Sequence, residues 1–213
     1  MIDFVNEGSG DIICDVAAII VSNRAYLSEI DGKIGDGDHG VNMAKGFGRA
    51  AERMEGRDLS LSEAMAELSD VLMSEIGGSM GPLYGMMFAN MAESIDGVSE
   101  IDARAFADML RSGVDGVQDI GAASVGDKTM LDSLVPAVEA FARSLDNGGS
   151  FSVALSKMEN AAVIGRDCTI DMIAKVGRAS RLGERSRGVL DAGATSCCLI
   201  LRALGDGVSK RLS

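Results

Sequence analysis

The chain has 213 residues, 46% of them hydrophobic, which is enough for one substantial core and suits a single domain. Its net charge of −12 argues against sequence-independent binding to DNA, RNA or an anionic membrane, because basic surfaces supply the affinity there. The N-terminus is acidic, unlike a signal peptide, and no apolar run reaches the length of a membrane span. The four cysteines form no Cys-x-x-Cys pair, so we expect a protein of the reducing cytoplasm with buried thiols.

Apolar residues recur at helical spacing along almost the whole chain, and alternating strand-like runs are absent. Ser60 and Glu63 form a capping box, and Gly77 ends the helix that it opens. Pro82 and Pro136 are each expected near a helix start, where proline is tolerated. The predicted helices cover 11–30, 39–55, 60–76, 81–94, 102–119, 130–145, 151–164, 168–176 and 193–205. Without an internal repeat or a linker, the pattern predicts one all-α domain over 1–213.

The stretch 31–42 gathers three carboxylates, Asp31, Asp36 and Asp38, with the only histidine of the chain, His39. The spacing of the acids would not place all three on one face of a helix, and the intervening glycines disfavour helix, so we expect a loop. Carboxylates at close range repel, and a hard divalent cation removes that penalty. An EF-hand would need a glutamate at its twelfth position, where this chain has Asn42, so Ca²⁺ in such a loop is excluded.

The acidic stretch therefore predicts one or two Mg²⁺ ions that carry the phosphates of a nucleotide. The alternative is that Asp38 only caps the helix that starts near His39 while Asp31 and Asp36 are solvated. His39 either touches a ligand or is an ordinary surface or core histidine.

Three further segments have chemical content, each with a plainer alternative. The glycine-rich junction at 77–82 is a phosphate cradle or a tight turn. Residues 126–132 open a helix with cap-forming side chains, and Lys128 within them is solvated or touches phosphate. Residues 177–188 hold four arginines in an otherwise acidic chain, which suits phosphate recognition or a solvated basic loop.

Taken together and in order, these segments resemble the nucleotide-binding (DhaL) subunit of dihydroxyacetone kinase, of the DAK2-domain family. The resemblance spans nearly the whole chain. Its motifs are Gly-Asp-Gly-Asp-His-Gly at 35–40 with Asn42, Gly-Gly-x-x-Gly-Pro-Leu-Tyr-Gly at 77–85, Gly-Asp-Lys-Thr-Met at 126–130, Gly-Arg-Ala-Ser-x-Leu-Gly-Glu-Arg-Ser at 177–186, and Asp-x-Gly-Ala-Thr-Ser at 191–196. The chain departs from the family pattern at Met80, Arg181, 124–125 and 189–192.

The resemblance implies a single-domain, eight-helix up-and-down barrel with two Mg²⁺ ions and ADP or ATP at one rim. The residues to which it gives catalytic roles are Asp31, Asp36, Asp38 and Arg178, the three aspartates being the metal ligands. The residues that it places against the nucleotide are His39, Gly40, Asn42, Ser79, Met80, Gly121, Thr129, Met130, Arg178 and Asp191.

By the same resemblance the chain is a homodimer that passes phosphate to dihydroxyacetone or a similar short ketose. A separate (DhaK-like) subunit holds the ketose covalently through a histidine. The donor is exchangeable ATP, or ADP that stays bound and is recharged by a phosphotransferase-system (DhaM-like) subunit. The alternatives are a non-catalytic nucleotide sensor that binds a regulatory partner, and a kinase for another acceptor, such as erythrulose or a lipid.

Overall fold

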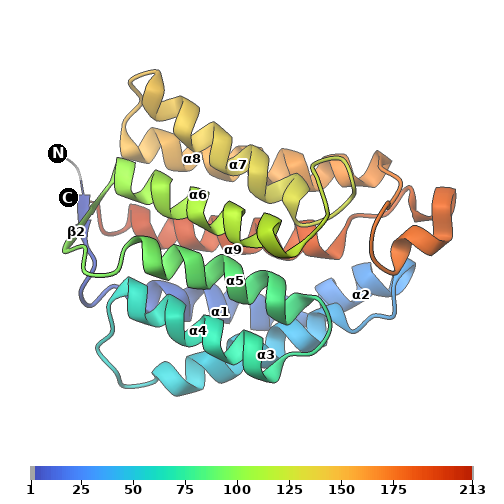
Figure 1. The fold of residues 1–213 in the computed structure, drawn as a ribbon, viewed down its shortest axis with the longest axis horizontal. Helices are drawn as coiled ribbons and strands as arrows, with labels where there is room; N and C mark the ends of the chain where they lie inside the picture. The colour runs from blue at the N-terminus through green and yellow to red at the C-terminus, as the bar shows by residue number, and fades with distance from the viewer. Residues whose placement is uncertain (1–2, 213) are drawn as a thin grey trace.

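The computed structural model describes residues 3–212 and is helical almost throughout (Figure 1). Two three-residue strands and two 3-10 helices accompany the nine α-helices of this part of the chain. In chain order the elements are β1 (Asp3–Val5), α1 (Asp11–Ser22), α2 (Arg24–Ile34), α3 (His39–Met54), α4 (Leu61–Glu75), α5 (Met80–Ser94), β2 (Glu100–Asp102), α6 (Ala103–Ile120), α7 (Leu131–Asp146), α8 (Phe151–Cys168), η1 (Thr169–Asp171), η2 (Ala179–Ser186) and α9 (Ala192–Ser209).

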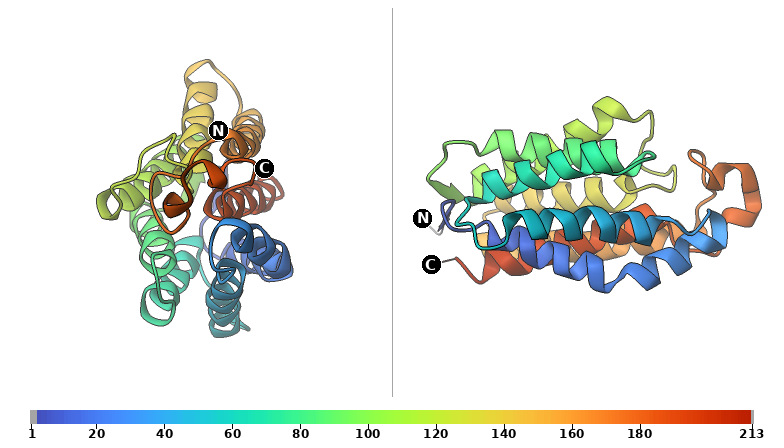
Figure 2. Two further views of the ribbon diagram at one scale, coloured as in Figure 1. Left: turned by 90° about the vertical axis from the view of Figure 1, so that its right-hand side faces the viewer. Right: turned by 90° about the horizontal axis from the view of Figure 1, so that it is seen from below.

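The helices form a closed ring. Going round it, α1, α3, α4, α5, α6, α7, α8 and α9 each pack on the next, and α9 returns to α1. The left view of Figure 2 looks along the ring, and its right view shows that successive helices run in opposite directions. Because α2 continues the line of α1, the ring has eight positions. The expected eight-helix up-and-down barrel is therefore confirmed.

The single helix predicted over 11–30 is wrong, because the chain breaks at Asn23. The Asn23 side chain and the Ser22 hydroxyl both donate to the carbonyl of Ile19, at 2.8 and 2.9 Å. Side-chain donors of this kind compete with the helical ladder and end α1 there. The break lets α2 (Arg24–Ile34) extend beyond the ring and contact both α3 and α9.

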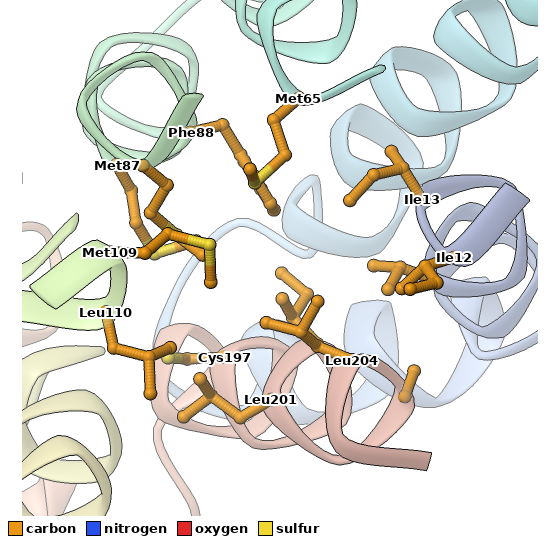
Figure 3. Packing of buried hydrophobic residues seen from close by; sticks show 14 of the residues in the cluster. Ile12, Ile13, Met65, Met87, Phe88, Met109, Leu110, Cys197, Leu201 and Leu204 are labelled. Atoms are coloured by element: carbon orange, nitrogen blue, oxygen red, sulfur yellow. The ribbon is translucent and has the colours of Figure 1, made fainter. Parts of the chain in front are cut away.

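Buried side chains from all round the ring meet along its axis (Figure 3). The residues labelled there include Ile12 from α1, Met65 from α4, Met109 from α6 and Leu201 from α9. Burial of so many apolar groups is the main favourable term in folding. Cys197 and Cys198 are buried in this core as expected, whereas Cys168 is exposed at the end of α8.

One end of the barrel lies opposite the connection between α2 and α3. It holds both ends of the described chain and a small antiparallel ribbon. Strands β1 and β2 pair with Phe4 opposite Ile101. They were not predicted, because three residues are too short for an alternating pattern. No helix in residues 3–212 has both the length and the apolar character that a membrane crossing requires.

The capping box that opens α4 is confirmed. The Ser60 hydroxyl accepts from the backbone N–H of Glu63 at 3.2 Å, and the Glu63 carboxylate accepts from the N–H of Ser60 at 2.9 Å. Two N–H groups that a helix start leaves free are thereby satisfied.

The expected helix over 168–176 is wrong. Helix α8 runs on to Cys168, a single 3-10 turn follows, and the chain then becomes irregular. The Thr169 hydroxyl donates to the carbonyl of Arg166 and accepts from the N–H of Asp191 at 3.0 Å. These bonds tie the end of α8 to the start of α9 and stop the helix.

Pro136 lies inside α7, not near its start as expected, while Pro82 does lie in the first turn of α5. Proline has no N–H, so the carbonyl of Asp132, four residues earlier, cannot receive its usual helical bond. Gly165 of α8 packs against that carbonyl so closely that a Cβ there would overlap it. Because glycine has no side chain, α7 and α8 can approach each other closely at Gly165.

Gly165→Ala should therefore lower the free energy of unfolding by about 1–3 kcal/mol, the range for overpacking a closed contact. Gly48→Ala is the matched control, because a Cβ at Gly48 of α3 would meet only the Val21 side chain at 3.7 Å. There the better helix propensity of alanine should raise stability by about 0.5–1 kcal/mol. Urea unfolding of both variants measures the difference, and equal effects would contradict the close contact.

Candidate functional site

A cavity of about 700 Å³ opens at the end of the barrel where α2 meets α3. This volume suits a small-molecule or cofactor site. Four connections reach it, between α2 and α3, α4 and α5, α6 and α7, and α8 and α9. All lie at the right-hand end of Figure 1, because an up-and-down ring returns alternate connections to the same end.

Asp31, Asp36 and Asp38 come together at the mouth of this cavity. Each offers one carboxylate oxygen, and these three oxygens lie within 4.8 Å of one another. Asp31 sits in the last turn of α2, so the acidic stretch is a loop only from Gly35 to Asp38, shorter than expected. Gly37 turns the chain there with φ of +77°.

Asp31, at the end of α2, ties this helix to the start of α3. Its carboxylate accepts the backbone N–H of His39, the first residue of α3, at 3.2 Å. Asp38 occupies the N-cap position, yet its side chain makes no capping hydrogen bond within the described chain. The structure therefore does not support the alternative in which Asp38 only caps α3. Its carboxylate is available to the acid cluster.

The acid cluster fits a hard divalent cation. Three carboxylate oxygens at this separation are the donor set that Mg²⁺ or a similar ion takes, with water and phosphate completing its shell. Arg178, brought over from η2, forms an ion pair with Asp36. Arg178 therefore brings positive charge from the chain itself to the acid cluster.

His39 lies behind the cluster, 7% exposed, in a buried polar network. Its Nε2 is 2.8 Å from the Ser196 hydroxyl, and the same hydroxyl is 2.7 Å from the Tyr84 hydroxyl. Tyr84 also donates to the carbonyl of Gly193 at 3.0 Å. Burial lowers the pKa of His39 to about 4, against the opposing effect of Asp31, so the imidazole is neutral at pH 7.

Asp191 lines the inner part of the cavity as the N-cap of α9, where its Oδ2 accepts from the N–H of Ala194 at 2.7 Å. Burial raises its pKa to about 7, and the Ala194 N–H and the Lys128 ammonium partly oppose that rise. A carboxyl group that is partly protonated near neutral pH can both donate and accept a hydrogen bond.

The glycine-rich connection delivers the start of α5 to the cavity. Ser79 is its N-cap residue, and within the described residues its side chain makes no capping bond to the first turn. The N–H groups of that turn and the positive end of the helix dipole therefore remain available to an anion. Ser79 and Met80 both line the cavity.

Most of the other expected nucleotide contacts also line the cavity, namely Asn42, Gly121, Thr129, Met130 and Arg178. Gly40 lies outside this lining. A Cβ at Gly40 would overlap the Arg24 carbonyl and Ser28, so this glycine allows α3 to pack closely on α2.

Sequence reasoning gave no role to Tyr84 or Ser196, and for Lys128 it offered solvation or a phosphate contact. Tyr84, Ser196 and Lys128 all fall within the motifs quoted for the family resemblance, and this was the available signal. Their hydrogen-bond partners, however, are distant in the chain. Lys128 lines the cavity but is not solvated, since its ammonium donates to three backbone carbonyls.

A family model and two relatives that cover most of the chain point to the same family of proteins. A DAK2 domain matches residues 33–206. The chain is 37% identical over 187 residues to the "PEP-dependent dihydroxyacetone kinase, ADP-binding subunit DhaL" of Escherichia coli, covering 87% of this chain and 89% of that one. It is 35% identical over 205 residues to the ADP-binding subunit DhaL of PEP-dependent dihydroxyacetone kinase 2 of Listeria innocua, covering 94% of each.

The fold is also found in a solved structure, the native dihydroxyacetone kinase of C. freundii, with a TM-score of 0.72 at 24% identity. The match covers 93% of this chain and 34% of that one, so the chain spans about a third of the larger protein. The same kinase solved in complex with AMP-PNP and Mg²⁺ gives a TM-score of 0.68. At this level of identity the likeness is one of fold.

Proposed function

The chain belongs to the DAK2-domain family, and on that premise we propose that it is the nucleotide-binding subunit of a kinase for dihydroxyacetone or a similar short ketose. The observation that carries the proposal is the meeting of three carboxylate oxygens within 4.8 Å at the mouth of a cavity of about 700 Å³. Relatives similar over most of their length are named as ADP-binding subunits.

In this proposal Asp31, Asp36 and Asp38 hold two Mg²⁺ ions, which supply charge neutralisation for the phosphates of ADP or ATP. The carboxylates are presented in fixed positions, because Asp31 belongs to a helix and is bonded to the start of the next one. Phosphoryl transfer depends on positioning and electrostatics more than on covalent chemistry with the protein. The chain therefore needs no residue of its own that becomes phosphorylated.

The phosphates of the nucleotide would lie between the acid cluster and the start of α5. The N–H groups at Ser79 and Met80 would donate to phosphate oxygens, and Arg178, which pairs with Asp36, would add positive charge. His39 presents a neutral ring fixed by Ser196. The nucleoside would then extend toward Gly121 and Met130, beside the apolar side chain of Leu83.

The ketose would be held by a partner subunit. The family's partner binds it covalently through a histidine, whereas the one histidine of this chain is buried and its Nε2 is engaged by Ser196. His39 is therefore not available for a covalent bond to a sugar. This supports a chain that supplies the phosphoryl group to a substrate presented across the rim.

Asp36→Ala tests the metal assignment. It should abolish Mg²⁺-dependent ADP binding in calorimetry and leave the helix content unchanged in circular dichroism, because Asp36 is exposed in a loop. The control is Glu29→Ala, which makes the same change of charge on the exposed face of α2, in an ion pair with Lys33. Wild-type affinity in the Asp36 variant would remove this carboxylate from the site.

We further propose that the nucleotide is ADP that stays bound and is recharged by a phosphotransferase-system subunit, because the relatives similar over most of their length are named PEP-dependent. Gel-filtered protein, once denatured, should release close to one ADP per chain. Protein that is empty after gel filtration, yet then turns over MgATP with a ketose-binding subunit, would contradict the tightly held ADP and support exchangeable ATP.

A further inference from the structure

The connection between α8 and α9 contains a long loop whose two ends meet. The N–H of Gly188 donates to the carbonyl of Ile170 at 2.7 Å, closing residues 170–188, which we call the rim loop. It includes η2 and carries Arg178, which forms the ion pair with Asp36. Figure 1 shows the loop projecting beyond the ring at the cavity end. A projecting loop needs its own anchor if a side chain on it is to be placed accurately.

Lys128 enters the base of this loop from the α6–α7 connection. It is 2% exposed, and its Nζ donates to the carbonyls of Met172 at 3.3 Å, Ser186 at 2.6 Å and Val189 at 2.7 Å. An ammonium has three N–H donors, so each has an acceptor. Charge-assisted hydrogen bonds of this kind are stronger than neutral ones.

The backbone at Lys128 is held in an unusual conformation to make this contact. Its φ of +64° lies in the left-handed region, which is unfavourable for a residue with a side chain. Asp132 enforces the turn, because its two carboxylate oxygens accept from the N–H groups of Gly126 and Thr129. Strain that the surroundings impose in this way is typical of functional positions.

We propose that Lys128 is a positioning residue that clamps the rim loop and so holds Arg178 beside the acid cluster. Although Lys128 lines the cavity, its three donors are directed to carbonyls of the rim loop and of Val189, which directly follows it, so Lys128 does not bind phosphate itself. A second contact acts with it: the Ser186 hydroxyl accepts from the N–H of Ala174 and donates to the carbonyl of Gly183. The expected effect on nucleotide affinity rests on the proposed function, whereas the clamping of the loop does not.

The first test is amide hydrogen exchange without nucleotide, comparing wild type with Lys128→Met, which keeps much of the side-chain length and removes the charge and donors. Exchange at Ala174 and Gly188 should become about ten-fold faster or more, with the core amides of α4 and α5 unchanged. Lys157→Met is the matched control, because Lys157 is an exposed lysine on α8, outside the rim loop. Unchanged exchange in the rim loop of the Lys128 variant would overturn the proposal.

The second measurement is MgADP affinity, which should fall about ten-fold in Lys128→Met and stay the same in Lys157→Met. A loss of affinity without faster loop exchange would make Lys128 a direct ligand and overturn its positioning role. If the wild type binds no nucleotide, the proposed function fails while the exchange result still decides the clamp.

Should Lys128→Met not fold, Lys128→Gly serves in its place. Glycine accepts the positive φ without strain, yet it also removes the ammonium. Its rim loop should exchange faster to a similar extent, and a protected loop in this variant would equally contradict the clamp.

Discussion

The mutual repulsion of three carboxylates within 4.8 Å is the constraint on which the arrangement of the rim depends. Such a cluster persists only if the backbone holds it and positive charge is brought to it. The backbone does so through Asp31, which is anchored in α2 and bonded to the first N–H of α3. Positive charge comes from Arg178, from the dipole of α5 and, in the proposed function, from Mg²⁺.

The barrel turns this local arrangement into a site. Because the ring is closed and its helices alternate in direction, four connections that are far apart in sequence surround one cavity. The opposite end holds the β1–β2 ribbon and takes no part in the cavity. A rigid ring thus carries four short, chemically different connections, which is the common division between scaffold and functional loops.

The sequence was sufficient for features that are local in the chain. Helices have a period that can be read within one segment, and the acid cluster lies within eight residues. The features that could not be predicted join distant segments. The three acceptors of Lys128 are backbone carbonyls 44, 58 and 61 residues away, and a carbonyl has no sequence signature. The contact between Tyr84 and Ser196 spans 112 residues.

The wrong helix predictions have both local and distant causes. Apolar spacing indicates where a helix is favourable, but Asn23 ends α1 through a local side-chain bond to the carbonyl of Ile19. Thr169 bonds the nearby carbonyl of Arg166 and also the N–H of Asp191, 22 residues away. Pro136 is tolerated inside α7 while Gly165, on another helix, packs against the carbonyl that the proline leaves without its helical bond. Apolar periodicity alone does not reveal these contacts.

We propose that the aspartate cluster binds a nucleotide through Mg²⁺. This is tested by calorimetric titration of ADP into metal-free, nucleotide-free protein, once with Mg²⁺ and once with a chelator. Clear binding of about one ADP per chain is expected with Mg²⁺, and little or none without it. Equal affinity under both conditions would contradict the proposed role of Mg²⁺. Without a cation between them, the carboxylates would repel the phosphates of ADP.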